Sequence, residues 1–323
     1  TEVMANLISR YRMVSNNIEE TLVKMMKEIK GSYALVILTP KKLVGIRDPL
    51  GMRPLCIGKL NSSYVLASES CALDAIEADF IRDLDPGEIV VIGEDGIKSI
   101  QTGGASKSHL CIFEFVYFAR PDSRIDNMSV HSARMEAGRE LAREHPVEAD
   151  LVIGAPDGGL NAALGFSRES GIPYGQGLLK NKYVGRTFIQ PEQGQRDIGV
   201  RIKFNAMRNE LEGKRIVMVD DSIVRGTTTR RIVQMIKNAG ASEVHIRISS
   251  PPYRFPCFFG IDTATKKQLV ASRYSIEEIK DMIGADSLEY LSLEGLLNSI
   301  SGGAGCGFCT ACFDGSYPIE VPV

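Results

Sequence analysis

The stretch that decides the fold is K-R-I-V-M-V-D-D-S-I-V-R-G-T-T-T-R, residues 214–230. Residues 216–219 form the short apolar run of a buried strand, and Asp220 and Asp221 follow at its end. Gly226 lets the next turn fold tightly, and Thr227 begins a segment with apolar residues at helical spacing. Free N–H groups, hydroxyls and the positive end of the helix dipole then converge beside two carboxylates. The segment therefore predicts a phosphate-binding loop.

The surrounding sequence places this loop in a parallel α/β sheet. Gly240 ends the helix and a second strand is expected over residues 244–248. A strand, a helix and a parallel strand make one crossover unit, which binds its ligand at the carboxyl ends of its strands. The same order recurs earlier, with a strand over residues 151–155, a glycine-containing loop and a helix over residues 161–170.

Two neighbouring acids beside a phosphate loop suit a sugar phosphate, because carboxylates accept hydrogen bonds from ribose hydroxyls or hold Mg²⁺. The run D-D-S-I-V-R-G-T-T resembles the phosphoribosylpyrophosphate (PRPP) signature of type I phosphoribosyltransferases, and is most similar to that of the glutamine PRPP amidotransferases. We expect both acids at an exposed strand end, and the alternative is an ordinary strand and helix with solvated acids. The resemblance implies Mg²⁺ at the two acids and substrate contacts from Asp220, Asp221, Ser222, Ile223, Val224, Arg225, Gly226, Thr227 and Thr228.

The first third of the chain is similar to the glutaminase half of the same family, through R-D-P-L-G-M-R-P-L-C-I-G at residues 47–58 and V-L-A-S-E-S-C-A-L-D at residues 65–74. The implied fold class is α/β: a type I phosphoribosyltransferase parallel sheet plus a truncated N-terminal-nucleophile (Ntn, αββα) glutaminase-like domain. We expect the partial Ntn domain at residues 1–101, the phosphoribosyltransferase domain at 102–270, and a C-terminal helical segment with a cysteine-rich tail at 271–323. Helical spacing over residues 2–29 and strand patterns over 33–38, 43–46, 64–67 and 89–92 agree with this division.

Two further segments are expected around the substrate. Between Lys180 and Arg208 the chain carries seven basic and two acidic side chains, which is typical of a lid that neutralises pyrophosphate, although a solvated surface loop has the same composition. We expect Tyr183, Arg186 and Lys203 to reach the reacting centre. In the family a serine that touches the metal usually stands at the position of Gly158. A Mg²⁺ contact there would use the backbone or water.

The seven cysteines are an odd number, which argues against a disulfide framework. The tail C-G-F-C-T-A-C (residues 306–312) has two overlapping C-x-x-C pairs, a spacing that grips iron or zinc. Cys111 and Cys257 lie in aromatic segments that would shield a metal site, although alone they are typical of buried small hydrophobes. The set resembles the [4Fe–4S] site of the cluster-containing branch of the family, with ligands at Cys111, Cys257, Cys309 and Cys312. Cys306 is then spare or an alternate ligand.

The start of the chain departs from the family pattern. These enzymes begin with a cysteine whose own amino group is the base for glutamine hydrolysis. Here Thr1 and Glu2 match a segment beyond the glutamine-binding residues. We therefore expect the 323 residues as given to use ammonia and not glutamine, and the sequence leaves open whether they are a fragment.

Composition agrees with a two-domain enzyme: 44% hydrophobic, 24% charged, net charge −2. We expect no nucleic acid or membrane partner, because the charge is balanced and no long apolar run is present, and we expect a cytoplasmic location. The resemblance implies the first step of de novo purine synthesis: PRPP and ammonia, taken from glutamine in the full-length enzyme, give 5-phosphoribosylamine and pyrophosphate. It also implies a homotetramer inhibited by purine nucleotides. The alternatives are a nucleobase phosphoribosyltransferase and a non-catalytic PRPP-binding regulator.

Overall fold

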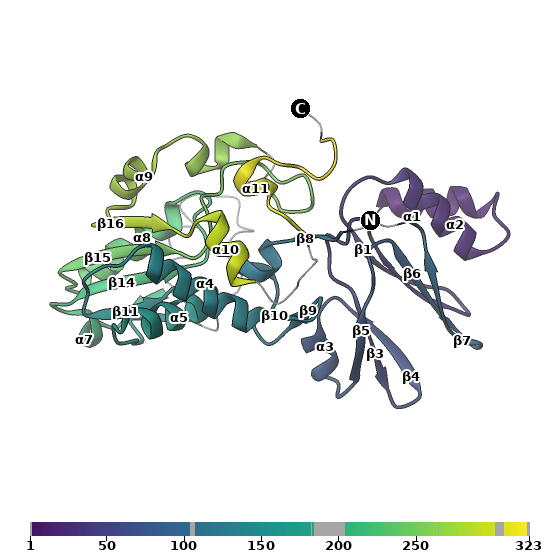
Figure 1. Cartoon of the computed structure of the whole chain (residues 1–323), viewed down its shortest axis with the longest axis horizontal. Helices are drawn as coiled ribbons and strands as arrows, with labels where there is room; N and C mark the ends of the chain where they lie inside the picture. The colour runs from purple at the N-terminus through teal and green to yellow at the C-terminus, as the bar shows by residue number, and fades with distance from the viewer. Residues whose placement is uncertain are drawn as a thin grey trace.

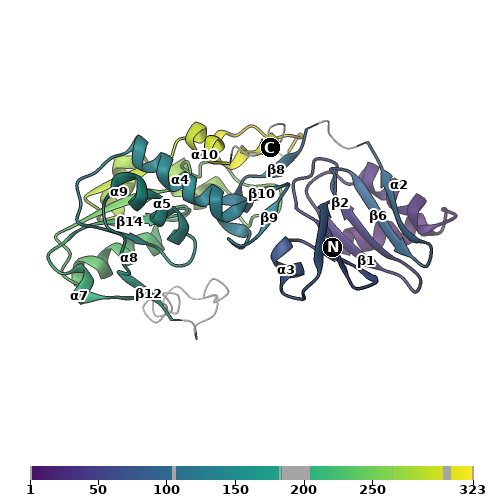
Figure 2. The ribbon, with the colours of Figure 1, turned by 60° about the horizontal axis from the view of Figure 1, so that its bottom comes forward.

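The computed structural model describes residues 2–103, 107–181, 183, 204–263, 265–300 and 307–321. Two lobes lie side by side (Figures 1 and 2). The first contains the N-terminal helices and antiparallel sheets, and the second contains a parallel sheet covered by helices. The C-terminal segment, drawn in yellow, lies at the junction of the lobes in both views.

The first lobe has four layers. Its central sheet has the strand order β1-β2-β6-β7, and a second sheet has the order β4-β3-β5. Helices α1 and α2 cover one face of the central sheet through Leu22, Met25, Val44 and Ile46, whereas α3 packs through Leu73 on the outer face of the second sheet. The bounds are α1 (Glu2–Arg12), α2 (Ile18–Glu28), β1 (Ala34–Leu38), β2 (Leu43–Arg47), β3 (Cys56–Leu60), β4 (Ser63–Ala67), α3 (Ser70–Asp74), β5 (Asp79–Asp83), β6 (Glu88–Gly93) and β7 (Gly96–Gln101).

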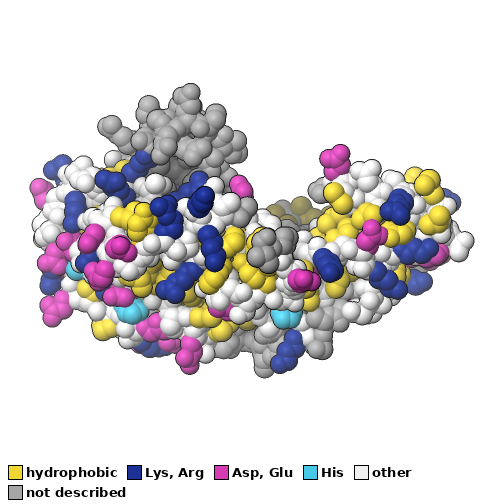
Figure 3. All heavy atoms as spheres, turned by 90° about the horizontal axis from the view of Figure 1, so that it is seen from above, with side chains coloured by type: hydrophobic (Ala, Val, Ile, Leu, Met, Phe, Trp, Pro, Cys, Tyr) yellow, Lys and Arg dark blue, Asp and Glu magenta, His cyan; other side chains and the backbone are white. Residues whose placement is uncertain are grey.

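This αββα order confirms the predicted fold class for the first lobe. The two sheets meet through Leu55, Ile57, Leu84 and Val90. Helix α1 has no buried residue, and large hydrophobic side chains such as Val3 are exposed on it. In Figure 3 hydrophobic side chains gather on this lobe, at the right of the view.

The second lobe is built on a parallel sheet with the order β11-β14-β15-β16. Helices α4, α5 and α10 pack on one face, and α8 and α9 on the other. The bounds are α4 (Val130–Glu144), β11 (Leu151–Gly154), α5 (Leu160–Ser170), β14 (Arg215–Asp220), α8 (Thr227–Asn238), β15 (Glu243–Ile248), α9 (Ile276–Ile283), β16 (Ser287–Tyr290) and α10 (Leu293–Ser299).

Strand β14 shows why this sheet forms. Val217 and Val219 enter the core beneath α4 and α5, and Ile216 and Met218 enter the core beneath α8. A strand buried on both faces has a continuous apolar run, which is what the sequence has here. Beyond the boundary predicted at residue 270, β16 pairs with β15 and lies at the edge of the same sheet.

Shorter elements connect the lobes and border the predicted lid. Strand β8 pairs in parallel with β17, β9 pairs with β10, and β12 pairs antiparallel with β13. Their bounds, with the remaining helical turns, are β8 (His109–Cys111), the π-helix η1 (Glu114–Phe118), β9 (Arg124–Ile125), β10 (Met128–Ser129), β12 (Leu178–Lys180), β13 (Phe204–Ala206), α7 (Arg208–Leu211), the 3₁₀ turns η3 (Lys266–Gln268) and η4 (Val270–Ser272), β17 (Gly307–Cys309) and α11 (Ala311–Asp314).

Buried polar contacts fasten the first lobe to the second. Arg47 is 1% exposed and donates to both carboxylate oxygens of Asp126, at 2.8 and 2.9 Å. In the segment that follows β2, the Met52 carbonyl accepts from the Cys111 N–H at 3.1 Å. The first lobe therefore supplies backbone contacts to β8. Within the described ranges, no helix is long and apolar enough to cross a membrane.

Candidate active site and cysteine pocket

The predicted phosphate loop lies between β14 and α8. Gly226 precedes the helix with φ +76°, a left-handed conformation that favours glycine. The Ile223 side chain is buried in the core, and the Val224 carbonyl accepts from the Val270 N–H at 2.9 Å. These contacts fix the loop from behind, so its N–H groups and the first turn of α8 remain available to an anion.

The acid pair differs from the prediction in its burial. Asp221 is 8% exposed, whereas both acids were expected at an exposed strand end. The Ser222 hydroxyl donates to Asp221 Oδ1 at 2.6 Å, and the Asp221 N–H donates to Asp220 Oδ1 at 2.9 Å. Burial raises the pKa of Asp221 to about 6, and burial together with the Asp221 charge raises the pKa of Asp220 well above its ordinary value. Two such carboxylates favour a bound cation or proton.

The loop after β11 explains why Asp221 is buried. The Pro156–Asp157 peptide bond is cis, and Gly158 and Gly159 follow it. A Cβ added at Gly158 would lie 1.8 Å from Asp221 Oδ2, and one at Gly159 would lie 2.2 Å from the Val219 carbonyl oxygen. The loop covers the acid pair only because it has no side chains there. Because Gly158 has no side chain, only its backbone atoms are available to a metal ion.

The predicted lid is described only at its edges. Strands β12 and β13 border it, and Lys180 forms an ion pair with Asp157 of the loop after β11. Tyr183 is fully exposed, and its N–H donates to Asn181 Oδ1 at 3.0 Å. Arg186 and Lys203, predicted to reach the substrate, lie outside the described residues.

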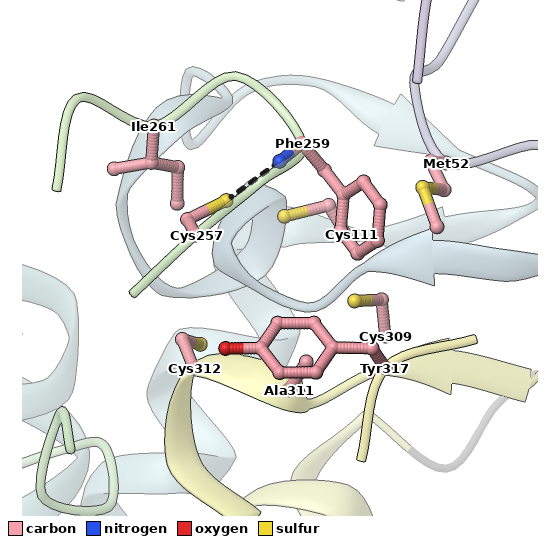
Figure 4. Close-up of a pocket in the computed structure, with 9 residues that line it drawn as sticks. All are labelled: Met52, Cys111, Cys257, Phe259, Ile261, Cys309, Ala311, Cys312 and Tyr317. Carbon is pink, nitrogen blue, oxygen red and sulfur yellow. Dashed lines mark hydrogen bonds between the residues drawn. The ribbon is translucent and has the colours of Figure 1, made fainter. Parts of the chain in front are cut away.

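Four of the predicted metal ligands, Cys111, Cys257, Cys309 and Cys312, line one pocket at the junction of the lobes (Figure 4). The parallel pairing of β8 with β17 places Cys111 opposite Cys309. Figure 4 shows the four sulfurs facing a shared space. The remaining lining residues are Met52, Phe259, Ile261, Ala311 and Tyr317. Cys306 lies outside the described residues.

All four cysteines of the pocket are free thiols. Burial raises the pKa of Cys111 to about 12 and also raises the pKa of Cys309 and Cys312. Over the described ranges, no group of three or more His, Cys, Asp or Glu residues is placed to hold a single metal ion. The four sulfurs are thus arranged around a shared space and not around one point. Because burial disfavours the charged thiolate form, a positively charged group nearby is required to stabilise it.

Sequence reasoning missed several residues at these two sites. It assigned no role to Met52, which lines the cysteine pocket, or to Arg53, which donates to the carbonyl of the pocket residue Phe259. It also missed Arg134, a buried guanidinium on α4 that donates to the carbonyls of Phe115 and Ala119. Burial raises the pKa of Asp221, and the charge of Arg134 offsets part of that rise. A basic residue inside an otherwise apolar helix face was the available signal.

Two family models match the chain. A glutamine amidotransferase domain matches residues 1–75, and a phosphoribosyl transferase domain matches residues 126–249. The first match lies in the αββα lobe, and the second contains β11, α5, β14, α8 and β15. The two lobes therefore correspond to two known domain types.

Curated relatives and solved structures match nearly the whole chain. It is 50% identical to the amidophosphoribosyltransferase of Archaeoglobus fulgidus over 323 residues, covering 100% of this chain and 71% of the relative. It is 50% identical to the Bacillus subtilis amidophosphoribosyltransferase, covering 99% and 68%. The structure of B. subtilis glutamine PRPP amidotransferase complexed with ADP and GMP superposes with a TM-score of 0.90, covering 99% of this chain and 70% of that one.

A second structure, described as the allosteric regulatory enzyme of purine biosynthesis, superposes with a TM-score of 0.91 at 50% identity, covering 100% of this chain and 70% of that one. These relatives give no support to a nucleobase phosphoribosyltransferase or a non-catalytic regulator. The chain therefore belongs to the amidophosphoribosyltransferase family, pentosyltransferases that convert PRPP and ammonia to 5-phosphoribosylamine and pyrophosphate in purine synthesis.

Proposed function

We propose that the acid pair and the loop before α8 form the PRPP site of this amidophosphoribosyltransferase. Asp220 and Asp221 hold the ribose hydroxyls and Mg²⁺, and the segment from Ser222 to Thr228 holds the 5-phosphate. The observation that carries the proposal is the position of two carboxylates with raised pKa directly before the N-terminus of a 12-residue helix. The acid pair thus suits the Mg²⁺ that accompanies PRPP, and the adjacent helix N-terminus suits its 5-phosphate.

The chain's own groups position the reactants more than they transfer protons. Ammonia is already a nucleophile, so the site needs to orient PRPP with its C1 open to attack. Mg²⁺, when bound, supplies positive charge to the departing pyrophosphate. The Gly158–Gly159 loop packs against Asp221 and the end of β14, which fixes the position of the acid pair. We propose that Tyr183, Arg186 and Lys203 of the basic segment close over the substrate and that the backbone at Gly158 faces the metal side.

Steady-state kinetics at saturating ammonium test this proposal. Asp220→Asn and Asp221→Asn should each lower kcat/KM for PRPP by at least about a hundredfold, because each removes charge that the metal and the ribose need. Asp74→Asn is the matched control, since Asp74 is exposed on α3 in the first lobe, away from the acid pair and its covering loop. Unchanged kcat/KM in both site variants would exclude these acids from the PRPP site.

We further propose that the cysteine pocket holds a [4Fe–4S] cluster, with ligands at Cys111, Cys257, Cys309 and Cys312. Four free thiols around one shared space suit an inorganic group larger than a single ion. Phe259, Ile261 and Tyr317 provide the apolar shell that such a group requires. The Phe259 N–H lies 3.3 Å from Cys257 Sγ and donates to it, as hydrogen bonds to cluster sulfurs commonly do.

The remaining partners follow from the family. We propose that ammonia comes from glutamine in the intact enzyme and that purine nucleotides inhibit it, since the B. subtilis relative was solved with ADP and GMP. A homotetramer and a cytoplasmic location are the corresponding proposals for assembly and compartment. Size-exclusion chromatography with light scattering tests the first of these directly.

A further inference from the structure

Arg53 places a positive charge of the first lobe beside the cysteine pocket of the second. Its Nη1 lies 2.8 Å from Glu114 Oε1, and its Nη2 donates to the Phe259 carbonyl at 2.8 Å. The guanidinium also lies over the Phe118 ring, 5.5 Å from the ring centroid. Three contacts from the second lobe thus fix one side chain from the first.

The loop that carries Cys257 is shaped to admit this guanidinium. Gly260 has φ +102°, and an added Cβ would lie 3.0 Å from Arg53 Nη2. The neighbouring residue of Arg53, Met52, lines the pocket, and its carbonyl accepts from the Cys111 N–H. The backbone conformation of each lobe therefore accommodates the contact between Arg53 and the loop that carries Cys257.

The pocket needs such a charge. Its nine lining residues are cysteines or uncharged side chains, so none of them balances a thiolate. Arg53 Nη2 donates to the carbonyl of Phe259, and the N–H of the same residue donates to Cys257 Sγ at 3.3 Å. Phe259 itself lines the pocket. The guanidinium therefore lies against the segment that forms one wall of the pocket and carries one of its sulfurs.

We propose that Arg53 is the counter-charge of the cluster pocket, held in place by Glu114, so that the glutaminase-like lobe stabilises the metal group of the transferase lobe. This inference rests on the proposed cluster. A [4Fe–4S] group with four thiolates carries net negative charge, and a nearby cation in a partly buried site stabilises it against losing an electron. Glu114 is 6% exposed and has the opposite sign, so its own charge acts against the cluster.

The two residues of the ion pair therefore give opposite predictions. Arg53→Gln removes the favourable charge and should hasten cluster loss in air, where one electron passes from the cluster to O₂ and the overoxidised cluster releases iron. Glu114→Gln removes the unfavourable charge but keeps an amide oxygen that can accept from Arg53 Nη1, and the contacts of Arg53 with Phe259 and Phe118 remain. Its cluster should therefore last as long as in the wild type or longer. A purely structural role for the ion pair predicts faster loss in both variants.

The experiment uses protein purified without oxygen, with iron and acid-labile sulfide measured per chain before air is admitted. The decay of the visible absorption band should be at least about tenfold faster in Arg53→Gln than in the wild type and within about threefold of it in Arg53→Lys, which keeps the charge. Arg82→Gln is the control, because Arg82 pairs with Glu88 within the first lobe at 2.6 Å and carries the same charge. It should decay as the wild type does.

Each outcome has a separate meaning. Absence of iron and sulfide from the wild type would overturn the cluster proposal itself. A wild-type cluster with equal decay in Arg53→Gln, or with accelerated decay in Glu114→Gln, would overturn the counter-charge role and leave the cluster standing. If Arg53→Gln fails to fold, the double variant with Glu114→Gln leaves no unpaired buried carboxylate. Its cluster should decay faster than in Glu114→Gln alone, and equal decay would refute the inference.

Discussion

Replacing Asp221 by asparagine is expected to stabilise the ligand-free protein while disabling its substrate site. Burial raises the pKa of Asp221 from 3.8 to about 6, so the folded state binds this proton more tightly than the unfolded state does. Between about pH 4 and pH 6 the folded state therefore holds more protons, and stability falls as pH rises through that window. A difference of about two pH units corresponds to at most about 3 kcal/mol lost by neutral pH.

The asparagine side chain in the Asp221→Asn variant would carry no charge, so this loss should disappear. In metal-free buffer at about pH 7.5 the free energy of unfolding of Asp221→Asn should exceed that of the wild type by up to about 3 kcal/mol. At about pH 4 the two proteins should differ little, apart from the weakened hydrogen bond from Ser222. Urea denaturation at a series of pH values measures both quantities. Asp74→Asn, at an exposed position on α3 in the first lobe, should follow the wild type throughout.

The same variant should lose the stabilisation that Mg²⁺ and PRPP give to the wild type, because a ligand stabilises only a state that it binds. Stability that is gained in this way at the expense of binding marks a functional site. A pH profile of Asp221→Asn parallel to that of the wild type, or a less stable variant at about pH 7.5, would refute the argument that the buried acid is destabilising.

Three further predictions concern the scaffold. Gly165→Ala should destabilise the protein by about 1–3 kcal/mol in urea unfolding, because its Cβ would lie 1.9 Å from the Met135 carbonyl oxygen and force α4 and α5 apart; an unchanged midpoint would contradict that packing. Asp126→Asn should cost about 3 kcal/mol, because it removes the one carboxylate that forms an ion pair and two hydrogen bonds with the buried Arg47 among the described residues, and a neutral result would show that the pair is solvated. Burial raises the pKa of Asp83 to about 6, so the wild type loses stability as pH rises from about 4 to 6. The free energy of unfolding of Asp83→Asn should therefore increase relative to that of the wild type over this range. A difference between the two proteins that stays constant with pH would exclude this titration.

Local sequence signals were sufficient for the transferase fold. The apolar run of β14, its two terminal acids and Gly226 before α8 lie within one continuous stretch, so strand, loop and helix could be predicted together. The C-x-x-C spacing of the tail is also a local pattern, but Cys111 and Cys257 were joined to it through the family resemblance, because alone they are typical of buried small hydrophobes.

Contacts between distant segments could not be predicted in the same way. The burial of Asp221 depends on Gly158, more than sixty positions earlier in the chain, because only a residue without a side chain lets that loop cover the acid. Arg53 and Glu114 are 61 residues apart and meet only when the two lobes dock. Neither residue has an unusual sequence neighbourhood, so its role is set by tertiary structure.

The most direct test of the proposed PRPP site is PRPP-dependent release of pyrophosphate by this chain with ammonium or with purine and pyrimidine bases as acceptor. We expect Mg²⁺-dependent release with ammonium, its loss in Asp220→Asn and Asp221→Asn, and no release that depends on a base. Release with a nucleobase and none with ammonium would contradict this expectation, since the PRPP site would then serve a different acceptor.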